Sequence, residues 1–137
     1  MNNKKEIPFG EFVALMALYV ALMAMSIDTI LPALSLLGKD LGVVDENSTQ
    51  YIIGIIFLGF TFGQIIYGPI ADSFGRKPTV YIGLVIFAIG DLLSLQSQDF
   101  TTMLLGRLLQ GFGAASPRII STAIIRDLYN GREMARV

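Results

Sequence analysis

Four ionisable side chains fall inside long apolar stretches of this chain: Asp28, Asp91, Arg107 and Arg118. A charged side chain at the centre of a membrane-spanning helix costs about 2.5 to 3.5 kcal/mol on insertion scales, so each needs a partner, water or a function. A carboxylate in a low-dielectric environment can load and release protons, and an arginine beside it changes how readily it does so. These acids and bases therefore indicate proton coupling, with static structural ion pairs as the alternative for Asp28, Asp91 and Arg118.

The two arginines share one face of their predicted helix. Arg107, Gln110, Gly111, Ala114 and Arg118 project to the same side, because eleven residues make almost three turns. That face alternates polar and small side chains, so we expect a water-accessible wall. Arg118 lies about 16 Å along the helix from Arg107 and could instead reach the lipid headgroups.

Small residues surround Asp28 on its own helix. Ala17, Ala21, Ala24 and Met25 precede it at offsets that place them on its face. We expect this stripe to leave space beside the carboxylate, although tight helix packing would use the same residues.

A short turn between two apolar stretches concentrates charge. Gly68, Asp72, Gly75, Arg76 and Lys77 lie in or beside a predicted connection of about five residues. Gly75 supplies backbone freedom for the tight hairpin. Asp72 can cap a helix, pair with Arg76 or Lys77, or reach the positive end of a helix in another bundle. We interpret the turn as a gate, or alternatively as a basic loop that only sets topology.

The composition places these residues in a membrane protein. The chain has 137 residues, of which 53% are hydrophobic, and the charges fall mostly between apolar stretches. Four stretches near or above the roughly 20 residues needed to cross a bilayer predict an all-α protein with spans at 9–37, 51–71, 79–95 and 101–125. Without cysteine or histidine, thiolate or imidazole metal sites and the common nucleophile–histidine pairs are excluded. We expect no enzyme activity, metal or cofactor.

Basic residues are distributed asymmetrically around the predicted spans. Seven lie on one side and only Lys39 on the other; the seven are Lys4, Lys5, Arg76, Lys77, Arg126, Arg132 and Arg136. The positive-inside rule then makes both termini and the Asp72 turn cytoplasmic. Because these bases are dispersed at membrane boundaries, nucleic-acid binding is not indicated.

With this orientation three of the charges share one depth. A rise of 1.5 Å per residue places Asp28 about 20 to 27 Å, Asp91 roughly 18 Å and Arg107 about 21 Å from the cytoplasmic edge. We expect Arg107 to pair with Asp28 or with Asp91, which leaves the other acid free to titrate.

Two further features concern packing. Gly59 and Gly63 are spaced for close helix contact, with Gly54 and Gly68 a little off that face. Asp99 precedes the fourth stretch and suits an N-cap or first-turn acid.

Two motifs in the chain resemble those of a known transporter family. Gly68, Asp72, Gly75, Arg76 and Lys77 match the G-x-x-x-D-x-x-G-R-K signature of the major facilitator superfamily. A second set matches its R-x-x-Q-G-x-G-A-A signature: Arg107, Gln110, Gly111, Gly113, Ala114 and Ala115.

The segment around Asp28 and Pro32 looks like the D-x-x-x-P-A-L segment of the drug:proton antiporters, particularly the bicyclomycin-resistance branch. The Arg126-Asp127-Leu128-Tyr129 segment is similar to that branch as well.

This resemblance implies a twelve-helix fold of two six-helix halves with alternating access around a central cavity. Residues 1–137 would form part of the N-terminal half. By matching position, Asp28 would bind protons or cationic substrate, Arg107 would take part in proton coupling, and Asp72 with Arg76 would form the gating contact between halves.

The resulting expectation is a bacterial inner-membrane, multi-pass antiporter that exports small amphipathic or cationic molecules in exchange for protons. Its partners would be substrate, protons, the lipid bilayer and the C-terminal part of the transporter, and we expect this segment alone to be inactive. The alternatives are a complete four-helix small multidrug exporter and a non-transporting membrane interaction or sensor subunit.

Overall fold

The computed structural model describes residues 9–30, 32, 36, 39–40, 42 and 46–128. Within this part the chain forms four long helices: α1 (Phe9–Asp28), α3 (Glu46–Phe74), α4 (Arg76–Leu95) and α5 (Phe100–Leu128). All four predicted helical stretches are therefore present, with different ends.

Helix α1 is shorter than the predicted span. It ends at Asp28, with Thr29 and Ile30 in a turn. Pro32 explains this end, because a proline ring clashes with the carbonyl four residues earlier and disfavours helical geometry in the residue before it. The other residues of the predicted span after Ile30 lie mostly outside the described part, as do residues 1–8 and 129–137.

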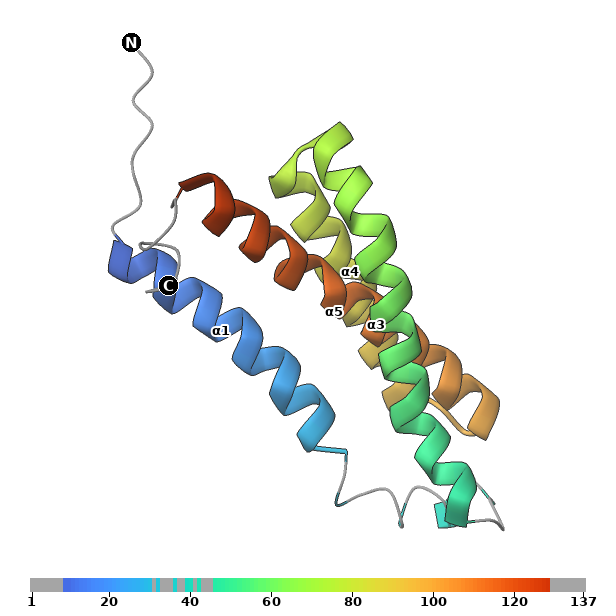
Figure 1. Cartoon of the computed structure of the whole chain (residues 1–137). Coiled ribbons are helices and arrows are strands. Elements are labelled where there is room, and N and C mark those ends of the chain that lie inside the picture. Colours follow the sequence, from blue (N-terminus) through green and yellow to red (C-terminus); the bar gives the residue numbers. More distant parts are fainter. Residues whose placement is uncertain are drawn as a thin grey trace.

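Helix α5 lies between α3 and α4, and it packs along both of them (Figure 1). Helices α3 and α4 hardly contact each other, although only Gly75 separates them in sequence. Helix α1 lies apart from this three-helix layer and makes only light contact with α5. A small apolar cluster of Ile30, Ile52 and Met103 joins the end of α1 to the starts of α3 and α5.

Two of the described helices are long and apolar enough to cross a membrane by themselves: residues Gln50–Phe74 and Arg76–Leu95. Large apolar side chains on these helices remain exposed, among them Phe62, Ile65 and Tyr81. Exposed apolar surface of this extent is expected where lipid replaces water. Helix α5 is the least hydrophobic of the four, and its central position between α3 and α4 explains how it tolerates polar residues.

The start of α5 is capped as the sequence predicts. The carboxylate of Asp99 accepts hydrogen bonds from the Thr102 backbone amide at 3.0 Å and from the Thr102 hydroxyl at 2.7 Å. These bonds hold the pKa of Asp99 below its usual range, because they favour the charged form. The short connection thus fixes α4 and α5 as an antiparallel hairpin.

Candidate functional site

Glycines bring α5 into close contact with both of its neighbours. A Cβ built on Gly59 of α3 would meet the carbonyl oxygen of Leu108, and one on Gly90 of α4 would meet the backbone nitrogen of Gln110. Nothing lies within 4 Å of such an atom on Gly54 or Gly68. The predicted division between contact glycines and off-face glycines of α3 is therefore confirmed.

This close approach lets Gln110 join two charged residues. Its Nε2 donates a hydrogen bond to Asp91 Oδ1 on α4 at 2.7 Å, and its Oε1 accepts one from Arg107 Nη1 at 2.6 Å. Gln110 is 3% exposed, so both bonds form largely away from solvent. The result is a carboxylate–amide–guanidinium chain that links α4 to α5.

The predicted direct ion pair of Arg107 with Asp28 or Asp91 is not present. Arg107 is instead connected to Asp91 through the Gln110 amide. Among the described residues the one ion pair joins Arg76 to Asp127, and Arg107 contacts neither Asp28 nor Asp91 directly. Arg107 Nε is buried and has no hydrogen-bond partner in the described part of the chain. Spacing placed Gln110 on the polar face, but it gave no signal that the amide would bridge Asp91 and Arg107.

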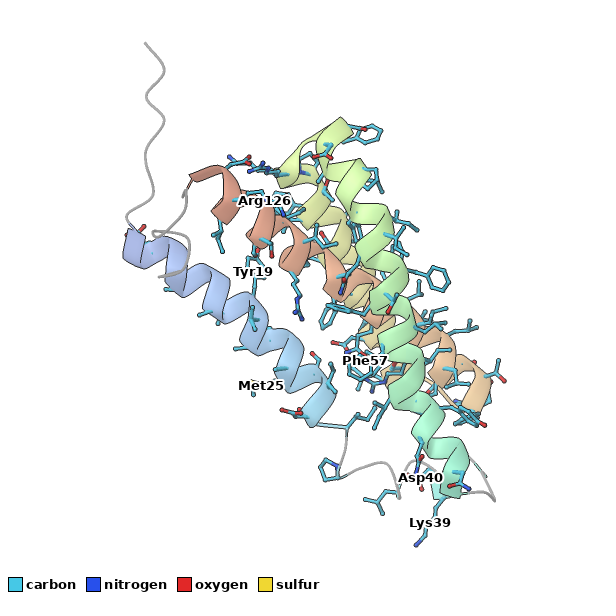
Figure 2. The ribbon with its side chains drawn as sticks, in the orientation of Figure 1. Tyr19, Met25, Lys39, Asp40, Phe57 and Arg126 are labelled. Carbon is cyan, nitrogen blue, oxygen red and sulfur yellow. The ribbon has the colours of Figure 1, made fainter. Side chains whose placement is uncertain are left out.

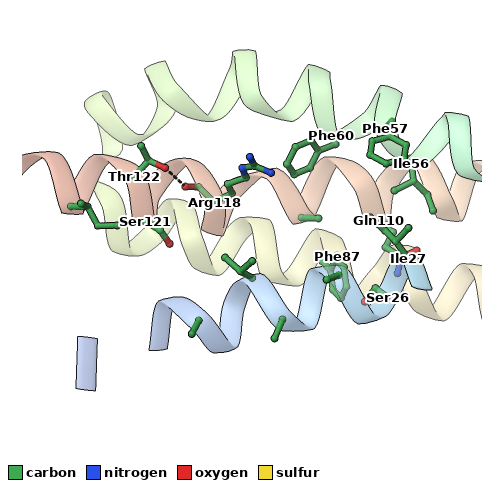
Figure 3. A pocket seen from close by; sticks show the side chains of 16 residues that line it. Ser26, Ile27, Ile56, Phe57, Phe60, Phe87, Gln110, Arg118, Ser121 and Thr122 are labelled. Atoms are coloured by element: carbon green, nitrogen blue, oxygen red, sulfur yellow. Dashed lines mark hydrogen bonds between the residues drawn. The ribbon is translucent and has the colours of Figure 1, made fainter. Parts of the chain in front are cut away.

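A cavity of about 830 Å³ separates α1 from α3 and α5. Figure 3 shows its labelled side chains, which come from all four helices. The predicted small-residue stripe of α1 lines this cavity through Ala17, Ala21 and Ala24, whereas Met25 is 64% exposed and lies on the outer side of α1 (Figure 2). The stripe therefore borders open space and is not a tight helix contact.

Asp28 stands at the edge of this arrangement. It is the last residue of α1, its side chain is exposed, and it makes no hydrogen bond or ion pair with other described residues. Ser26 and Ile27 line the cavity, but Asp28 does not. The structure thus brings Asp91, Gln110 and Arg107 together and leaves Asp28 outside that group.

Arg118 lies further along the same cavity wall. Its guanidinium carbon is 5.7 Å from the centre of the Phe60 ring, a cation–π geometry across α3 and α5. The side chain lines the large cavity and also a second cavity of about 340 Å³ beside the Asp72 turn. It makes no ion pair with the described residues.

The charged turn is tighter than predicted. Helix α3 continues to Phe74 and α4 begins at Arg76, so Gly75 alone forms the connection, with a φ of +93° that favours glycine. Its predicted backbone freedom is thereby confirmed, and the five-residue connection is corrected to one residue. Lys77 is exposed, and neither it nor Arg76 forms an ion pair with Asp72.

Arg76 pairs instead with a distant acid. Its guanidinium contacts the carboxylate of Asp127, near the end of α5 and 51 residues away. Asp72 lies in the wall of the second cavity together with Arg76, Arg118 and Arg126. The turn between α3 and α4 is therefore tied to the end of α5.

Comparison with known proteins decides the family, since the model of the Major Facilitator Superfamily matches residues 16–137. The chain belongs to the major facilitator superfamily. This is a family of multi-pass membrane transporters and not of enzymes. Membership in it excludes the alternative that the chain is a four-helix small multidrug exporter.

Similar proteins of the superfamily include several named for drug resistance. The chain is 34% identical to an uncharacterized transporter, YdgK, of Bacillus subtilis over 89% of its length. It is 31% identical to the bicyclomycin resistance protein homolog of Haemophilus influenzae over 92%, and 35% identical to the multidrug resistance protein MdtL of Klebsiella pneumoniae over 86%. The chain spans about a third of these relatives, 30%, 31% and 30% of their lengths in that order. No solved structure matches it significantly.

The superfamily signature on α5 has two physical roles in this chain. Gly111 faces the backbone of Ile56 on α3, and Gly113 faces Gly83 and Phe87 on α4, so neither position has room for a Cβ. Arg107 and Gln110 supply the polar chain described above. The signature thus combines helix packing on two sides with a buried polar contact.

Proposed function

We propose that this segment forms part of a proton-coupled exporter of drugs or other small amphipathic molecules, which works by alternating access in the full-length transporter. One observation carries the proposal: an apolar cavity of about 830 Å³ has Gln110 in its wall, and this residue connects Arg107 to Asp91. A large apolar cavity with few polar groups is typical of a small-molecule site. The names of the drug-resistance relatives support export as the direction.

Proton coupling is assigned to Asp28 and Arg107, with Asp91 acting through Gln110. Asp28 lies at the end of α1, exposed and without a hydrogen-bond partner among the described residues. The Gln110 amide already accepts a hydrogen bond from Arg107 and donates one to Asp91. A change in the charge or position of Asp91 would therefore alter the hydrogen bonds of the Arg107 guanidinium. Protonation of a carboxylate removes the charge that an arginine or an amide donor prefers.

Orientation follows from the charge distribution. We place both termini, and the turn of Gly68, Asp72, Gly75, Arg76 and Lys77, on the cytoplasmic side of the bacterial inner membrane. The contact between Arg76 and Asp127 supports one common side for the turn and the end of α5. In this arrangement Asp72 and Arg76 form one half of a gate.

The partners in the proposal are substrate, protons, lipid and the remainder of the transporter. Large apolar side chains on α3 and α4 provide the lipid-facing surface. The cavity lies open between helices, so we expect this segment alone to bind substrate poorly and not to transport it.

Substitution of Asp28 tests the coupling role in the full-length protein. Asp28→Asn keeps the shape but cannot exchange a proton, so substrate-driven proton release from everted vesicles should fall at least tenfold. Asp28→Glu is the matched control and should retain coupling. Intact proton-driven efflux by Asp28→Asn would overturn the assignment.

A further inference from the structure

Among the described residues that line the large cavity there is a single formal charge, and that charge is positive. Of the sixteen residues in its wall, Arg118 is the one with an ionised side chain. The others are mostly small or apolar, with aromatic surface from Phe57, Phe60 and Phe87. A cationic guest would therefore meet an unfavourable charge in this wall, whereas an anionic guest would meet a partner.

The guanidinium of the exposed Arg118 lies over an aromatic ring and has no hydrogen-bond partner among the described residues. The guanidinium carbon is 5.7 Å from the centre of the Phe60 ring, in a cation–π contact. Its N–H groups donate no hydrogen bond to other described residues, and no carboxylate pairs with it. A guanidinium has five donors in a planar fork that matches a carboxylate, so a carboxylate can bind in two parallel hydrogen bonds.

In the part of the chain that the structure describes, the neighbours of Arg118 do not cancel its charge. In the second cavity it lies with Asp72, Arg76 and Arg126. Arg76 is neutralised by Asp127, which leaves one acid against two bases in that cavity wall. The end of the large cavity that contains Arg118 is therefore electropositive, and Figure 3 shows the side chain directed toward Phe60 within the cavity.

We infer that Arg118 and Phe60 form a specificity subsite for planar aromatic compounds that carry a carboxylate or similar anionic group. The aromatic part packs against the phenylalanine surface, and the anionic group binds the guanidinium, which also stacks on planar rings. This inference rests on the proposed export function and, of the amphipathic or cationic molecules expected from the sequence, replaces the cationic ones with anionic ones.

The test uses two dyes with the same ring system and opposite charge. Carboxyfluorescein is anionic and rhodamine 123 is cationic near neutral pH, so fluorescence polarisation with purified full-length transporter compares charge at nearly constant shape. We expect the wild type to bind carboxyfluorescein at least tenfold more tightly than rhodamine 123. Equal binding, or tighter binding of rhodamine 123, would overturn the inference.

Variants then assign the preference to this side chain. Arg118→Gln should weaken carboxyfluorescein binding at least tenfold and leave rhodamine 123 unchanged or tighter. Arg118→Lys keeps the charge but not the planar fork, so it should lose part of that affinity. Arg126→Gln removes the same charge two turns further along α5, outside the large cavity, and should reduce the preference for carboxyfluorescein much less than Arg118→Gln does. An equal effect of Arg118→Gln on both dyes would contradict the subsite.

Transport measurements separate this inference from the proposed function. Proton-driven export of rhodamine 123 without any preference for carboxyfluorescein would leave the export function standing and refute the subsite. Arg118-dependent binding of carboxyfluorescein without proton-driven export of either dye would support the subsite and refute the proposed coupling.

Discussion

An amide side chain is suited to join an acid to a base because it donates from one end and accepts at the other. In Gln110 the NH₂ group faces Asp91 and the carbonyl oxygen faces Arg107. Both bonds require this orientation of the amide, because a carboxylate only accepts hydrogen bonds and a guanidinium only donates them. The Gln110 orientation that serves Arg107 therefore depends on Asp91 as an acceptor, although the two charged side chains form no ion pair.

Substitution of Asp91 should expose this dependence. Asp91→Leu leaves the Gln110 NH₂ buried without its charged acceptor and should lower the free energy of unfolding by about 1.5 to 3 kcal/mol. Asp91→Asn keeps an acceptor oxygen at the same place and should lose less. Chemical denaturation of the purified full-length transporter in mixed micelles measures both values. Wild-type stability in Asp91→Leu would mean that the bond to Gln110 contributes nothing.

At the scale of helices, glycines decide how closely α5 approaches its neighbours. A Cβ at Gly59 would meet the α5 backbone, whereas a Cβ at Gly54, on the same helix, has open space around it. Membrane helices gain stability from such close contact because burial from water contributes little within lipid.

The two glycines of α3 form a matched pair for a stability test. Gly59→Ala should destabilise the full-length protein by about 1 to 3 kcal/mol, because the helices must separate to admit the methyl group. Gly54→Ala should be neutral or stabilising by up to about 1 kcal/mol, since alanine favours the helix. Thermal unfolding in detergent compares them, and equal melting temperatures would contradict close packing at Gly59.

Local features of these helices could be predicted from the sequence. The contact face of Gly59 and Gly63 follows from helical periodicity, the cap at Asp99 from side-chain chemistry, and the turn at Gly75 from its conformational freedom. Each of these depends on residues close together in the chain.

Features that depend on distant partners could not be predicted in the same way. Asp127 pairs with Arg76 because α5 returns beside the turn, and the bridge from Gln110 to Asp91 depends on the rotation of α4 against α5. The end of α1 at Asp28 could have been predicted from Pro32, which disfavours helix in the residues before it. The predicted span was too long because the apolar sequence continues past Pro32.

For the whole molecule, the contact between Arg76 and Asp127 joins the first residue of α4 to the end of α5 on the proposed cytoplasmic side. The two side chains are 36% and 54% exposed, and exposed pairs contribute only about 0.2 to 1 kcal/mol. Such a contribution is small for folding, but about 1 kcal/mol already changes an equilibrium constant roughly fivefold. If the pair differs between inward-open and outward-open states, its loss changes transport more than stability.

A charge exchange tests this role in the full-length transporter. Arg76→Asp and Asp127→Arg each place like charges together, and each should lower the export rate several-fold while shifting the melting temperature little. The double variant restores an opposite pair and should recover at least half of the wild-type rate. Lys77→Asp is the control, because Lys77 is exposed and does not pair with Asp127. The double variant Lys77→Asp with Asp127→Arg should therefore not recover the export rate. A double variant as slow as the slower single variant would show that the contact does not control transport.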